Sequence, residues 1–582
     1  MKDSIKALRT RSGLSQIKFA AFLGVSVASL RRWEAGDASP SPLAKERVEA
    51  AMQLSDEALL ELCSQINIKE ESVPDEAYMT TFTFNGNSYR AEWMPYVING
   101  PIDQLDFYKK LIDLQQSART DLPKELYFSR LSMLRSVDGT ETAQYKMEQP
   151  KRNAKSWSSD YGTHSFHRYV GRFPPHLIRA IINSFGTTSK DTVLDPFCGS
   201  GTTLVEARML GVKAKGIEIS PLSAMMSRVK SQFPESGFPV AELLSELDEF
   251  YTEKWDAFLG AKSIEDFSYD EIFNRQGNSV SRFPNVERWF SKDALLGTSI
   301  TVEFILTKTG YVKDFLTIAL SAKMRSIGNV DVDVVRAEYR KTPRENVDVL
   351  KLMKSQMRKM SSGIAATVNA CKGTLGPSSD VEVFENSVLT TEIAPSSISH
   401  IITSPPYGVE SLSYLRTHLL SFRALESILG VDPYNFGEGI IGSEYLDGDI
   451  PDTNRFMVKN VSATYVSYFN EQLLAAEKPI DQKRIIMMMK FFEDMYGVIE
   501  RFSVWLKRNG KVAFIIGNKK IGDSIIPTDK IIEEIFNSFG FELNESIAHK
   551  LKTNNSNSHV PWQDRIIENE YVLLFQKVKE CV

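Results

Sequence analysis

The chain has 582 residues, of which 42% are hydrophobic and 25% charged, so it is long enough for three or four domains with apolar cores. No apolar run approaches the roughly 18 residues of a membrane span, and the beginning, Met1-Lys2-Asp3, does not fit a secretory signal. The net charge of −5 does not by itself indicate a nucleic-acid-binding protein. The first 50 residues hold nine Lys and Arg against five Asp and Glu; this local balance of +4 leaves −9 for the rest, so any contact with a polyanion must come from local basic faces.

Residues 1–68 are predicted to form a helical domain. Apolar residues in Ile5–Leu30 are spaced for helix faces. The strings Leu14-Ser15-Gln16 and Leu23-Gly24-Val25-Ser26, followed by a helix at Val27–Glu34, resemble the helix-turn-helix domains of the lambda-repressor/Xre class. The resemblance implies that this last helix enters the major groove and that the DNA contacts include Gln16, Ser26, Ser29, Arg31 and Arg32. A bundle that binds another protein is the alternative.

Residues 69–155 are predicted to form a linker and a small region that contains a hairpin. Glu70–Ala77 is acidic and polar, which is typical of a linker. Thr81–Glu92 alternates apolar and polar residues around Asn85-Gly86, a strong signal for a β-hairpin turn. Residues 100–150 look helical and polar, and no chemistry is assigned to them.

From residue 156 the chain alternates strands and helices, which predicts an α/β fold: a Rossmann-like parallel sheet with right-handed crossovers. The first part, 156–230, is followed by a mostly helical insert at 231–378, and the alternation resumes over 379–582. Expected strands before the insert are Thr192–Leu194 and Lys213–Ile217, and expected helices are Thr202–Leu210 and Leu222–Lys230. The elements expected after it are Val381–Phe384, His400–Ile402, Met495–Leu506, Val512–Ile516, Ile531–Phe539 and Glu570–Gln576, the last strands forming a closing antiparallel pair.

The string Asp195–Thr203 (Asp-Pro-Phe-Cys-Gly-Ser-Gly-Thr-Thr) follows a strand and opens a helix. Glycines there let the backbone approach a ligand closely, and the helix N-terminus supplies free N–H groups, although such a turn can also be purely structural. The complete string resembles motif I of the amino-methylating DNA methyltransferases. That resemblance implies a class I methyltransferase sheet with S-adenosylmethionine as its cofactor, held by Asp195, Pro196, Phe197, Gly199, Gly201, Thr202 and Thr203.

Glu218 ends the second strand, 23 residues after Asp195. An acidic side chain at that distance can accept hydrogen bonds from ribose hydroxyls, and the alternative is a solvated glutamate. Ile219-Ser220-Pro221-Leu222 continues the family's motif II pattern, which adds Ile219 to the implied cofactor contacts.

Three weaker matches support the same resemblance. His164–Ile178 resembles motif X, which closes over the methionine end of the cofactor and here includes Phe173. Asn386, in Phe384-Glu385-Asn386-Ser387, stands where the family usually has an aspartate that contacts the adenine ring. Gly517-Asn518 with Gly522-Asp523-Ser524 resembles the motif VI region.

The string Thr403-Ser404-Pro405-Pro406-Tyr407 stands at the end of the strand His400–Ile402. Its prolines cannot extend a hydrogen-bond ladder, so they stiffen a loop at the carboxyl end of the strand, where open α/β sheets bind ligands. A hydroxyl, a carbonyl and an aromatic face in such a loop suit a base extruded from DNA. A structural turn or a proline-rich ligand segment is the alternative for the string alone. It resembles motif IV of the same family, which implies that Ser404, Pro405, Pro406 and Tyr407 are the catalytic residues, side by side with the Asp195–Thr203 turn.

The Ser-Pro-Pro-Tyr form is commonest among cytosine-N4 enzymes, and Asp- or Asn-Pro-Pro-Tyr among adenine-N6 enzymes. The resemblance therefore implies a site-specific DNA methyltransferase acting on the N4 amino group of cytosine, in restriction-modification or phage defence. Adenine-N6 transfer on the same frame stays open, as does a DNA-binding regulator or defence-complex subunit whose fold only senses the cofactor. Cytosine-C5 transfer is excluded because it uses a Pro-Cys dipeptide, which the chain does not contain.

Motif X precedes motif I, and motif IV follows motif I by about 209 residues, as in the family's alpha arrangement, in which the insert commonly carries target recognition. Candidates within the insert are Arg282–Phe290 and a basic cluster, Arg336, Arg340, Lys341 and Arg344. The alternatives are a solvated helical face and recognition within Gly408–Gln482.

The expected partners are double-stranded DNA with one flipped base and a restriction endonuclease or another defence-system protein, with no membrane and no metal. The cysteines are scattered without metal-ligand spacing, at Cys63, Cys198, Cys371 and Cys581. This pattern indicates a reducing compartment and no zinc site, and the expected location is the prokaryotic cytoplasm.

Overall fold

A computed structural model gives the structure, which divides into two compact units, Met1–Ala77 and Tyr78–Val582. Each unit is considered by itself. The structure describes residues 2–12, 19, 23, 30, 33–34, 40, 42–55, 58–59, 79–94, 102–116, 122–148, 160–169, 171–331, 337–340, 342–408, 417–431, 440–442, 452–475, 479–521, 524–550 and 569–579.

The first unit is helical in its described residues. Helices α1 (Lys2–Ser12) and α4 (Pro42–Met52) contribute to one apolar core, formed by Ile5, Leu8, Phe19, Leu23, Leu30, Trp33, Val48, Ala51 and Leu59. At its edge, Arg9 Nε lies 2.6 Å from Glu34 Oε1. The predicted DNA contacts, Gln16, Ser26, Ser29, Arg31 and Arg32, all lie outside the described residues.

The second unit begins with a small antiparallel sheet of four strands, β1 (Met79–Phe84), β2 (Asn87–Trp93), β3 (Leu134–Val137) and β4 (Thr140–Glu141). The first two form the predicted hairpin, and Asn85 and Gly86 both have positive φ, as its tight turn requires. The expectation of helix throughout residues 100–150 is wrong at β3 and β4. Their turn is Asp138-Gly139, again with two positive φ angles, a hairpin signal that polar composition obscured.

Three helices accompany this sheet: α7 (Ile102–Gln116), α8 (Lys124–Arg130) and α9 (Ala143–Glu148). Arg130, which is buried, donates to the carbonyl oxygens of Thr187 and Leu210 at 3.1 and 3.4 Å. Helix α7 packs against α10 (Pro175–Ser184) and β12 (Phe541–Lys550) of the main sheet layer. The small sheet and its helices therefore belong to the same compact unit as the main sheet.

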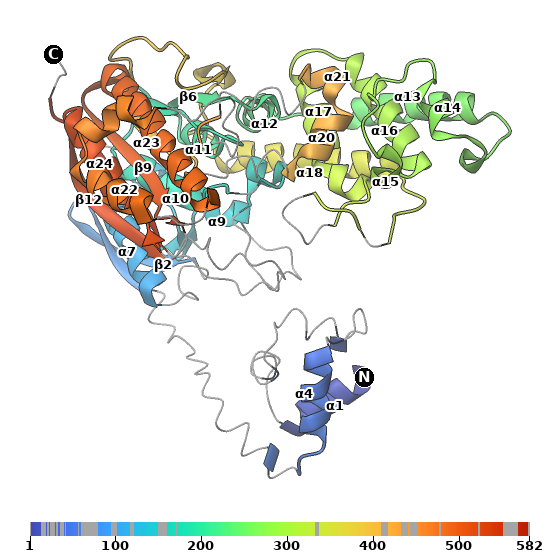
Figure 1. Ribbon diagram of the computed structural model, residues 1–582, viewed down its shortest axis with the longest axis horizontal. Helices are drawn as coiled ribbons and strands as arrows, with labels where there is room; N and C mark the ends of the chain where they lie inside the picture. The colour runs from blue at the N-terminus through green and yellow to red at the C-terminus, as the bar shows by residue number, and fades with distance from the viewer. Residues whose placement is uncertain are drawn as a thin grey trace. The chain divides into compact units, whose positions relative to one another are not determined.

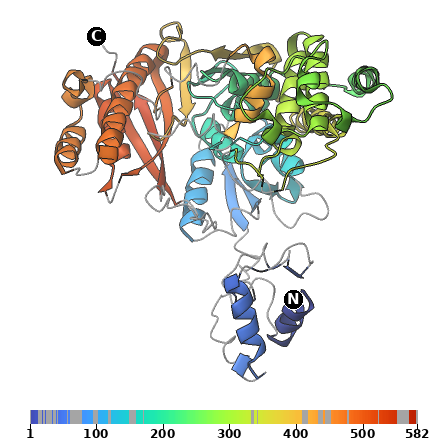
Figure 2. The same ribbon diagram turned by 45° about the vertical axis from the view of Figure 1, so that its right-hand side comes forward.

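The main sheet has seven strands in the order β12-β13-β9-β8-β5-β6-β7. Figure 2 shows its C-terminal strands, coloured orange to red, with helices beside them. Their bounds, besides β12, are β5 Thr192–Asp195, β6 Lys213–Glu218, β7 Val381–Glu385, β8 Ile398–Thr403, β9 Leu506–Gly517 and β13 Asn569–Lys577. Strand β13 is antiparallel to both neighbours, and the other pairings are parallel. The sheet is the expected Rossmann-like one, and the chain runs outward from β5 to β7 before it returns to β8 on the other side of β5. The switch point, where such sheets bind ligands, thus lies between β5 and β8.

Helices cover both faces of this sheet. They are α10, α11 (Thr202–Met209), α12 (Pro221–Ser231), α22 (Ala463–Ala475), α23 (Pro479–Trp505) and α24 (Thr528–Ser538), with short 3-10 turns at Gly162–Phe166, Ser378–Asp380, Thr453–Arg455 and Met457–Asn460. A two-stranded ribbon, β10 (Lys520–Ile521) and β11 (Ser524–Ile525), follows β9. The closing antiparallel pair expected from Val512–Ile516 and Glu570–Gln576 is confirmed as β9 and β13. Strand β12, which was not predicted, pairs with the other side of β13 and is also antiparallel to it.

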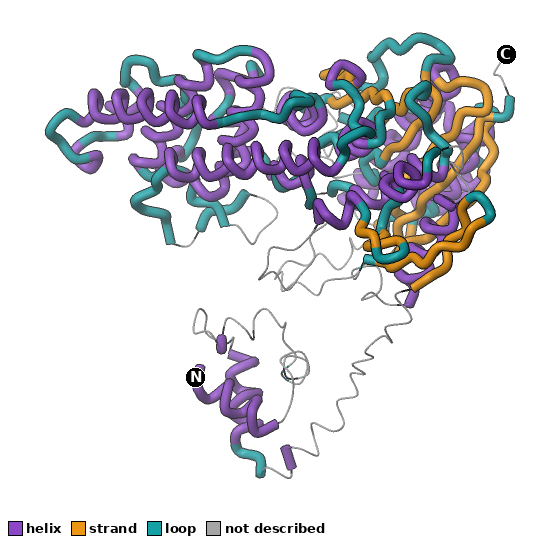
Figure 3. Tube along the Cα trace, turned by 180° about the vertical axis from the view of Figure 1, so that it is seen from behind, coloured by secondary structure: helices purple, strands orange, loops and turns teal. Residues whose placement is uncertain are grey.

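A block of helices occupies the expected insert: α13 (Ala241–Leu259), α14 (Tyr269–Phe273), α15 (Val286–Trp289), α16 (Lys292–Leu306), α17 (Gly310–Ile327) and α18 (Val349–Ala370), with a 3-10 turn at Ile264–Asp266. Figures 1 and 3 show this block as helices and loops beside the sheet region. Helices α20 (Leu419–Ala424) and α21 (Glu426–Leu429), which follow β8 in the chain, share its apolar core. The insert is thereby joined to the segment that follows the predicted catalytic loop.

Across the part of the chain that the structure describes, every helix is too short or too polar to span a bilayer. The same residues hold no group of three or more His, Cys, Asp or Glu side chains placed to bind a metal ion.

Candidate functional site

The two turns singled out in the sequence lie at the ends of neighbouring strands. Strands β5 and β8 pair in parallel register, with Leu194 opposite Ile401, and each ends where its turn begins. Thr403 Oγ1, at the end of β8, donates to Asp195 Oδ1, at the end of β5, over 2.7 Å. The expectation that these turns lie side by side is confirmed.

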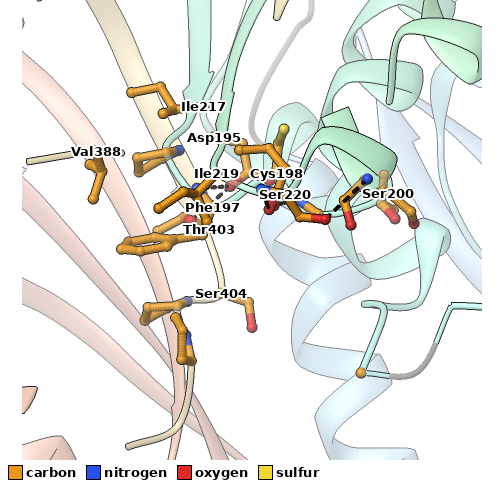
Figure 4. Close-up of a pocket in the computed structure, with 18 of the residues that line it drawn as sticks. Asp195, Phe197, Cys198, Ser200, Ile217, Ile219, Ser220, Val388, Thr403 and Ser404 are labelled. Atoms are coloured by element: carbon orange, nitrogen blue, oxygen red, sulfur yellow. Dashed lines mark hydrogen bonds between the residues drawn. The ribbon is translucent and has the colours of Figure 1, made fainter. Parts of the chain in front are cut away.

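The two turns line one cavity with about 1190 Å³ of empty space, part of it open to solvent (Figure 4). Of the residues expected to bind the cofactor or to catalyse, it is lined by Phe173, Asp195, Pro196, Phe197, Gly199, Thr202, Thr203, Glu218, Ile219, Asn386, Ser404, Pro405 and Pro406. Gly201 and Tyr407 are adjacent in sequence to residues that line the cavity, but they are not part of the lining themselves.

The glycine turn approaches its surroundings closely. Gly199 and Gly201 have φ angles of +51° and +82°, which residues with a side chain rarely adopt. A Cβ atom on Gly201 would lie 2.9 Å from Ser227 Cα, and Ser227 Oγ donates to the Gly199 carbonyl at 2.8 Å. The hydroxyl of Ser200 is buried and makes no hydrogen bond among the described residues. The turn therefore offers an unused hydroxyl and backbone groups to a ligand.

Asp195 ties the two turns together. Its Oδ1 accepts hydrogen bonds from Thr403 Oγ1 and the Phe197 N–H, and its Oδ2 accepts one from Thr203 Oγ1 at 2.6 Å. Burial raises the pKa of this carboxyl to about 6, although the hydrogen bonds from Thr203 and Thr403 act in the opposite direction. With three protein donors, this side chain fixes the shape of the site.

Glu218 lies at the end of β6, facing the cavity. Its two oxygens accept hydrogen bonds from the N–H groups of Gly199 and Ser220, at 2.9 and 2.8 Å. Burial raises its pKa to about 7, and these two backbone donors oppose that rise. Because a carboxylate has about four acceptor positions, it can still receive hydrogen bonds from hydroxyl groups in the cavity.

Asn386 follows β7, the strand beside β6. Its Oδ1 accepts hydrogen bonds from the Ser387 N–H and Thr390 Oγ1, at 2.8 and 3.1 Å. Its side-chain NH2 makes no hydrogen bond among the described residues, so it is available as a donor in the cavity.

A wall of aromatic and basic side chains closes the other side of the cavity. Tyr169 stacks on His418, with ring centres 5.7 Å apart, and lies against the Gly199 turn. Burial holds the pKa of His418 well below its usual value, so the imidazole is neutral. Arg172 donates to the His164 carbonyl and pairs with Asp160, and burial lowers its pKa to about 10.

These wall residues were not predicted from the sequence as members of the site. Tyr169 and Arg172 fall within the segment that resembles motif X, so its pattern could have indicated them. Ser200 likewise stands inside motif I. His418 gave no signal, because nothing in its local sequence links it to the glycine turn.

The loop after β8 is packed tightly. Gly408 has a φ of +89°, and a Cβ atom there would lie 2.4 Å from Met488 Sδ of α23. Pro405 is buried, and Tyr407 is half-buried against the apolar core that contains α23 and β9. The Tyr407 hydroxyl, 3.4 Å from Ser404 Oγ, donates to Glu570 Oε1 at 3.1 Å.

The basic residues predicted within the insert are only partly described. Arg336 and Lys341 lie outside the described residues. Arg340 Nε and Arg344 Nε donate to main-chain carbonyl oxygens, and Arg282 pairs with Asp270 at 2.6 Å. None of these contacts identifies a base-reading residue.

Comparison with known proteins gives two family matches. Residues 66–225 match the family described as DNA methylase (N6_N4_Mtase), and residues 5–59 match the helix-turn-helix family HTH_3.

Several curated relatives align over most of the chain. The type II methyltransferase M.BsoBI of Geobacillus stearothermophilus is 24% identical over 485 residues, 76% of this chain and 90% of the relative. M.MvaI of Kocuria varians is 25% identical, over 65% of this chain and 81% of the relative. M.AvaI of Nostoc sp. is 23% identical, over 70% of this chain and 85% of the relative. The aligned regions thus extend well beyond the two turns.

Proposed function

We propose that the product of this chain is N4-methylcytosine at a specific DNA site. The premise is that the chain is a DNA methyltransferase of the N6/N4 amino-methylating family with an amino-terminal helix-turn-helix domain. The observation that carries the proposal is the pairing of β5 with β8. It makes the glycine turn and the Ser-Pro-Pro-Tyr loop two sides of one cavity.

The cofactor of this family, S-adenosylmethionine, suits the residues of the cavity. Glu218 would accept hydrogen bonds from the ribose hydroxyls, since its two backbone donors leave acceptor positions toward the cavity. The amide donor of Asn386 would suit an acceptor nitrogen of the adenine ring. Gly199 admits the ligand close to the main chain, and the buried Ser200 hydroxyl gains a partner. Phe173 and Arg172 stand at the motif X wall, where the methionine end belongs.

When bound, the cofactor supplies a methyl group activated on a sulfonium centre. The base amine is a poor nucleophile because its lone pair is delocalised into the ring. Ser404 Oγ and the Pro405 carbonyl accept its two N–H groups, which favours a tetrahedral nitrogen with its lone pair directed away from the ring. Pro405 and Pro406 keep these acceptors in place, since their φ angles are fixed. Orientation of this kind accounts for a large part of the rate in such reactions, up to about 7–11 kcal/mol.

The choice of cytosine over adenine rests on Ser404. A neutral hydroxyl stands where the adenine-N6 members more often have Asp or Asn. We propose further that residues 1–68 bind DNA, that 156–230 with 379–582 form the catalytic region, and that the insert 231–378 recognises the target. Residues 69–155 are proposed to be the linker and the small hairpin-containing region. The setting would be a restriction-modification or phage-defence system in a prokaryotic cytoplasm, with double-stranded DNA as substrate and an endonuclease as partner.

The test is the modified nucleoside itself. The chain is expressed in a host that lacks DNA methylation, and the host DNA is digested to nucleosides and analysed by mass spectrometry. N4-methylcytosine supports the proposal, and N6-methyladenine would replace it by the adenine activity. The absence of both, with cofactor binding intact, would favour a subunit that only senses the cofactor. Sequencing of the modified DNA then gives the recognition site.

A further inference from the structure

A hydrogen-bonded chain runs from the Ser-Pro-Pro-Tyr loop to a carboxylate on another strand. Ser404 Oγ donates to the Tyr407 hydroxyl at 3.4 Å, and that hydroxyl donates to Glu570 Oε1 at 3.1 Å. Glu570 is the second residue of β13, which runs antiparallel to β9 and pairs there with Gly517. The start of β13 thus lies at the sheet edge where β8 and β9 end, which brings Glu570 to the loop.

The direction of this chain follows from what each group can do. A carboxylate accepts hydrogen bonds and donates none, so the Tyr407 proton must point to Glu570. The Tyr407 oxygen in turn accepts the Ser404 proton. With its proton used in this way, Ser404 Oγ keeps its lone pairs for an N–H group in the cavity.

Glu570 also contacts a residue of the neighbouring strand, β12. In the register of the closing strand pair it stands opposite His549 of β12, and His549 Nδ1 lies 3.6 Å from Glu570 Oε2. The His549 ring stacks on Phe107 of α7, with ring centres 4.3 Å apart and an angle of 19° between the planes. The carboxylate side chain is only 17% exposed. Its position is therefore set by two strands and a helix, independently of the loop it contacts.

We propose that Glu570 is a positioning residue for the methyl-transfer reaction: it orients the Tyr407 and Ser404 hydroxyls so that Ser404 Oγ accepts a hydrogen bond from the target amine. The inference rests on the proposed function, because it assigns Ser404 as that acceptor. Glu570 is not part of the cavity lining, so it acts through Tyr407 and Ser404. If Glu570 did not accept its proton, the Tyr407 hydroxyl could donate that proton to Ser404 Oγ. This hydrogen bond would occupy the acceptor position that the amine needs.

The experiment compares four variants with the wild-type chain on DNA that carries the recognition site: Glu570→Ala, Glu570→Gln, Tyr407→Phe and the double variant Tyr407→Phe/Glu570→Ala. The matched control is Glu542→Ala, which removes an exposed carboxylate at the other end of the same strand pair. Turnover, KM for DNA, cofactor affinity and thermal stability are measured for each.

We expect Glu570→Ala and Tyr407→Phe each to lower kcat roughly 10-fold, the value of one hydrogen bond to a charged acceptor. Glu570→Gln should stay close to the wild-type rate, since its amide oxygen still accepts from Tyr407. The double variant should be no slower than either single one, because both remove the same link. Cofactor affinity and the Glu542→Ala control should not change.

Each contrary outcome is informative. If Glu570→Gln is as slow as Glu570→Ala, the carboxylate does more than accept a hydrogen bond and the inference is overturned. Additive losses in the double variant overturn it too, because the two residues would then act separately. A wild-type chain that methylates no DNA refutes the proposed function, and the inference with it. An active wild type with an equally active Glu570→Ala variant refutes the inference alone.

Discussion

The two carboxylates at the carboxyl edge of the sheet, Asp195 and Glu218, are alike in charge but differ in their partners. Burial raises both pKa values, to about 6 and about 7. Asp195 is engaged by three protein donors that belong to the two turns. Glu218 is engaged by two backbone N–H groups and keeps acceptor positions toward the cavity. The first is suited to hold the site together, and the second to hold a ligand.

Replacing Glu218 should weaken cofactor binding before it affects any other property. The loss of two charge-assisted hydrogen bonds to ribose hydroxyls corresponds to a rise in Kd of roughly 10- to 100-fold for Glu218→Gln. Isothermal titration calorimetry with S-adenosylmethionine measures it. The control is Glu382→Gln, an exposed carboxylate on β7 that pairs with Lys215. Equal affinity for wild type and Glu218→Gln would remove Glu218 from the cofactor site.

The raised pKa of Glu218 also predicts how this affinity depends on pH. Ribose hydroxyls and a sulfonium centre favour the ionised carboxylate, so binding releases the proton that the free protein carries below pH about 7. The affinity should therefore rise with pH up to about 7 and then level off. In Glu218→Gln the rise in affinity near pH 7 should be absent. The remaining inflection in the affinity should be that of Asp195, near pH 6. A pH profile that is unchanged in the variant would contradict this assignment.

Tyr407→Ala should impair transfer while leaving cofactor binding intact. Loss of an aromatic stacking surface for an extruded base costs roughly 1–3 kcal/mol. The structure adds a second loss, since the variant also removes the hydroxyl between Ser404 and Glu570. Steady-state kinetics and calorimetry on the same preparation separate the two properties. Wild-type turnover in Tyr407→Ala would refute its catalytic assignment.

At the scale of elements, the site depends on how closely α12 approaches the turn between β5 and α11. Ser227 of α12 lies against Gly201 and hydrogen-bonds the Gly199 carbonyl. Glu218, at the end of β6, anchors the same turn by accepting a hydrogen bond from the Gly199 N–H. The turn is therefore shaped by packing as well as by its own glycines.

Gly201→Ala should destabilise the protein more than an alanine at a glycine with the same backbone angle but free space. Gly237, with a φ of +88° and no atom within 4 Å of an added Cβ, provides that control. Both variants strain the backbone, and only Gly201→Ala adds a clash with Ser227. We therefore expect Gly201→Ala to lower the free energy of unfolding by about 1–3 kcal/mol more than Gly237→Ala. Denaturant unfolding of the two variants measures the difference. Equal losses would show that α12 does not constrain the turn.

At the scale of the whole molecule, the chain divides into two compact units, for which we have proposed two different activities. The first unit, Met1–Ala77, has its own apolar core, and the second contains the complete sheet and both turns. A DNA-binding domain and a catalytic domain can then be tested apart.

Deletion of residues 1–77 should lower DNA affinity and make it less dependent on salt, because fewer phosphates are then contacted. Methyl transfer to a short duplex at saturating concentration should continue. Fluorescence anisotropy across several salt concentrations gives the slope, and incorporation of labelled methyl groups gives the activity. Identical DNA binding by the truncated chain would show that the first unit does not contact the substrate.

Much of the fold was accessible from sequence because its signals are local. The strands β5, β6, β7, β8 and β13 were predicted within a few residues, since each is a short run of residues whose ends are marked by local turn signals. Strand β12 was missed. It is an edge strand with a bulge near Leu543, only Phe541 and Ile547 are buried on it, and its polar sequence has no regular alternation.

The two strings of the site, Asp195–Thr203 and Ser404–Tyr407, can be found in the sequence because each is a contiguous loop whose glycines or prolines restrict its backbone. That these loops share one cavity follows from the fold alone, because it depends on β8 inserting beside β5 after an insert of more than a hundred residues. The tertiary structure alone brought His418 to Tyr169 and Glu570 to Tyr407. Contacts between such distant residues arise from strand order and helix packing, and no local pattern encodes them.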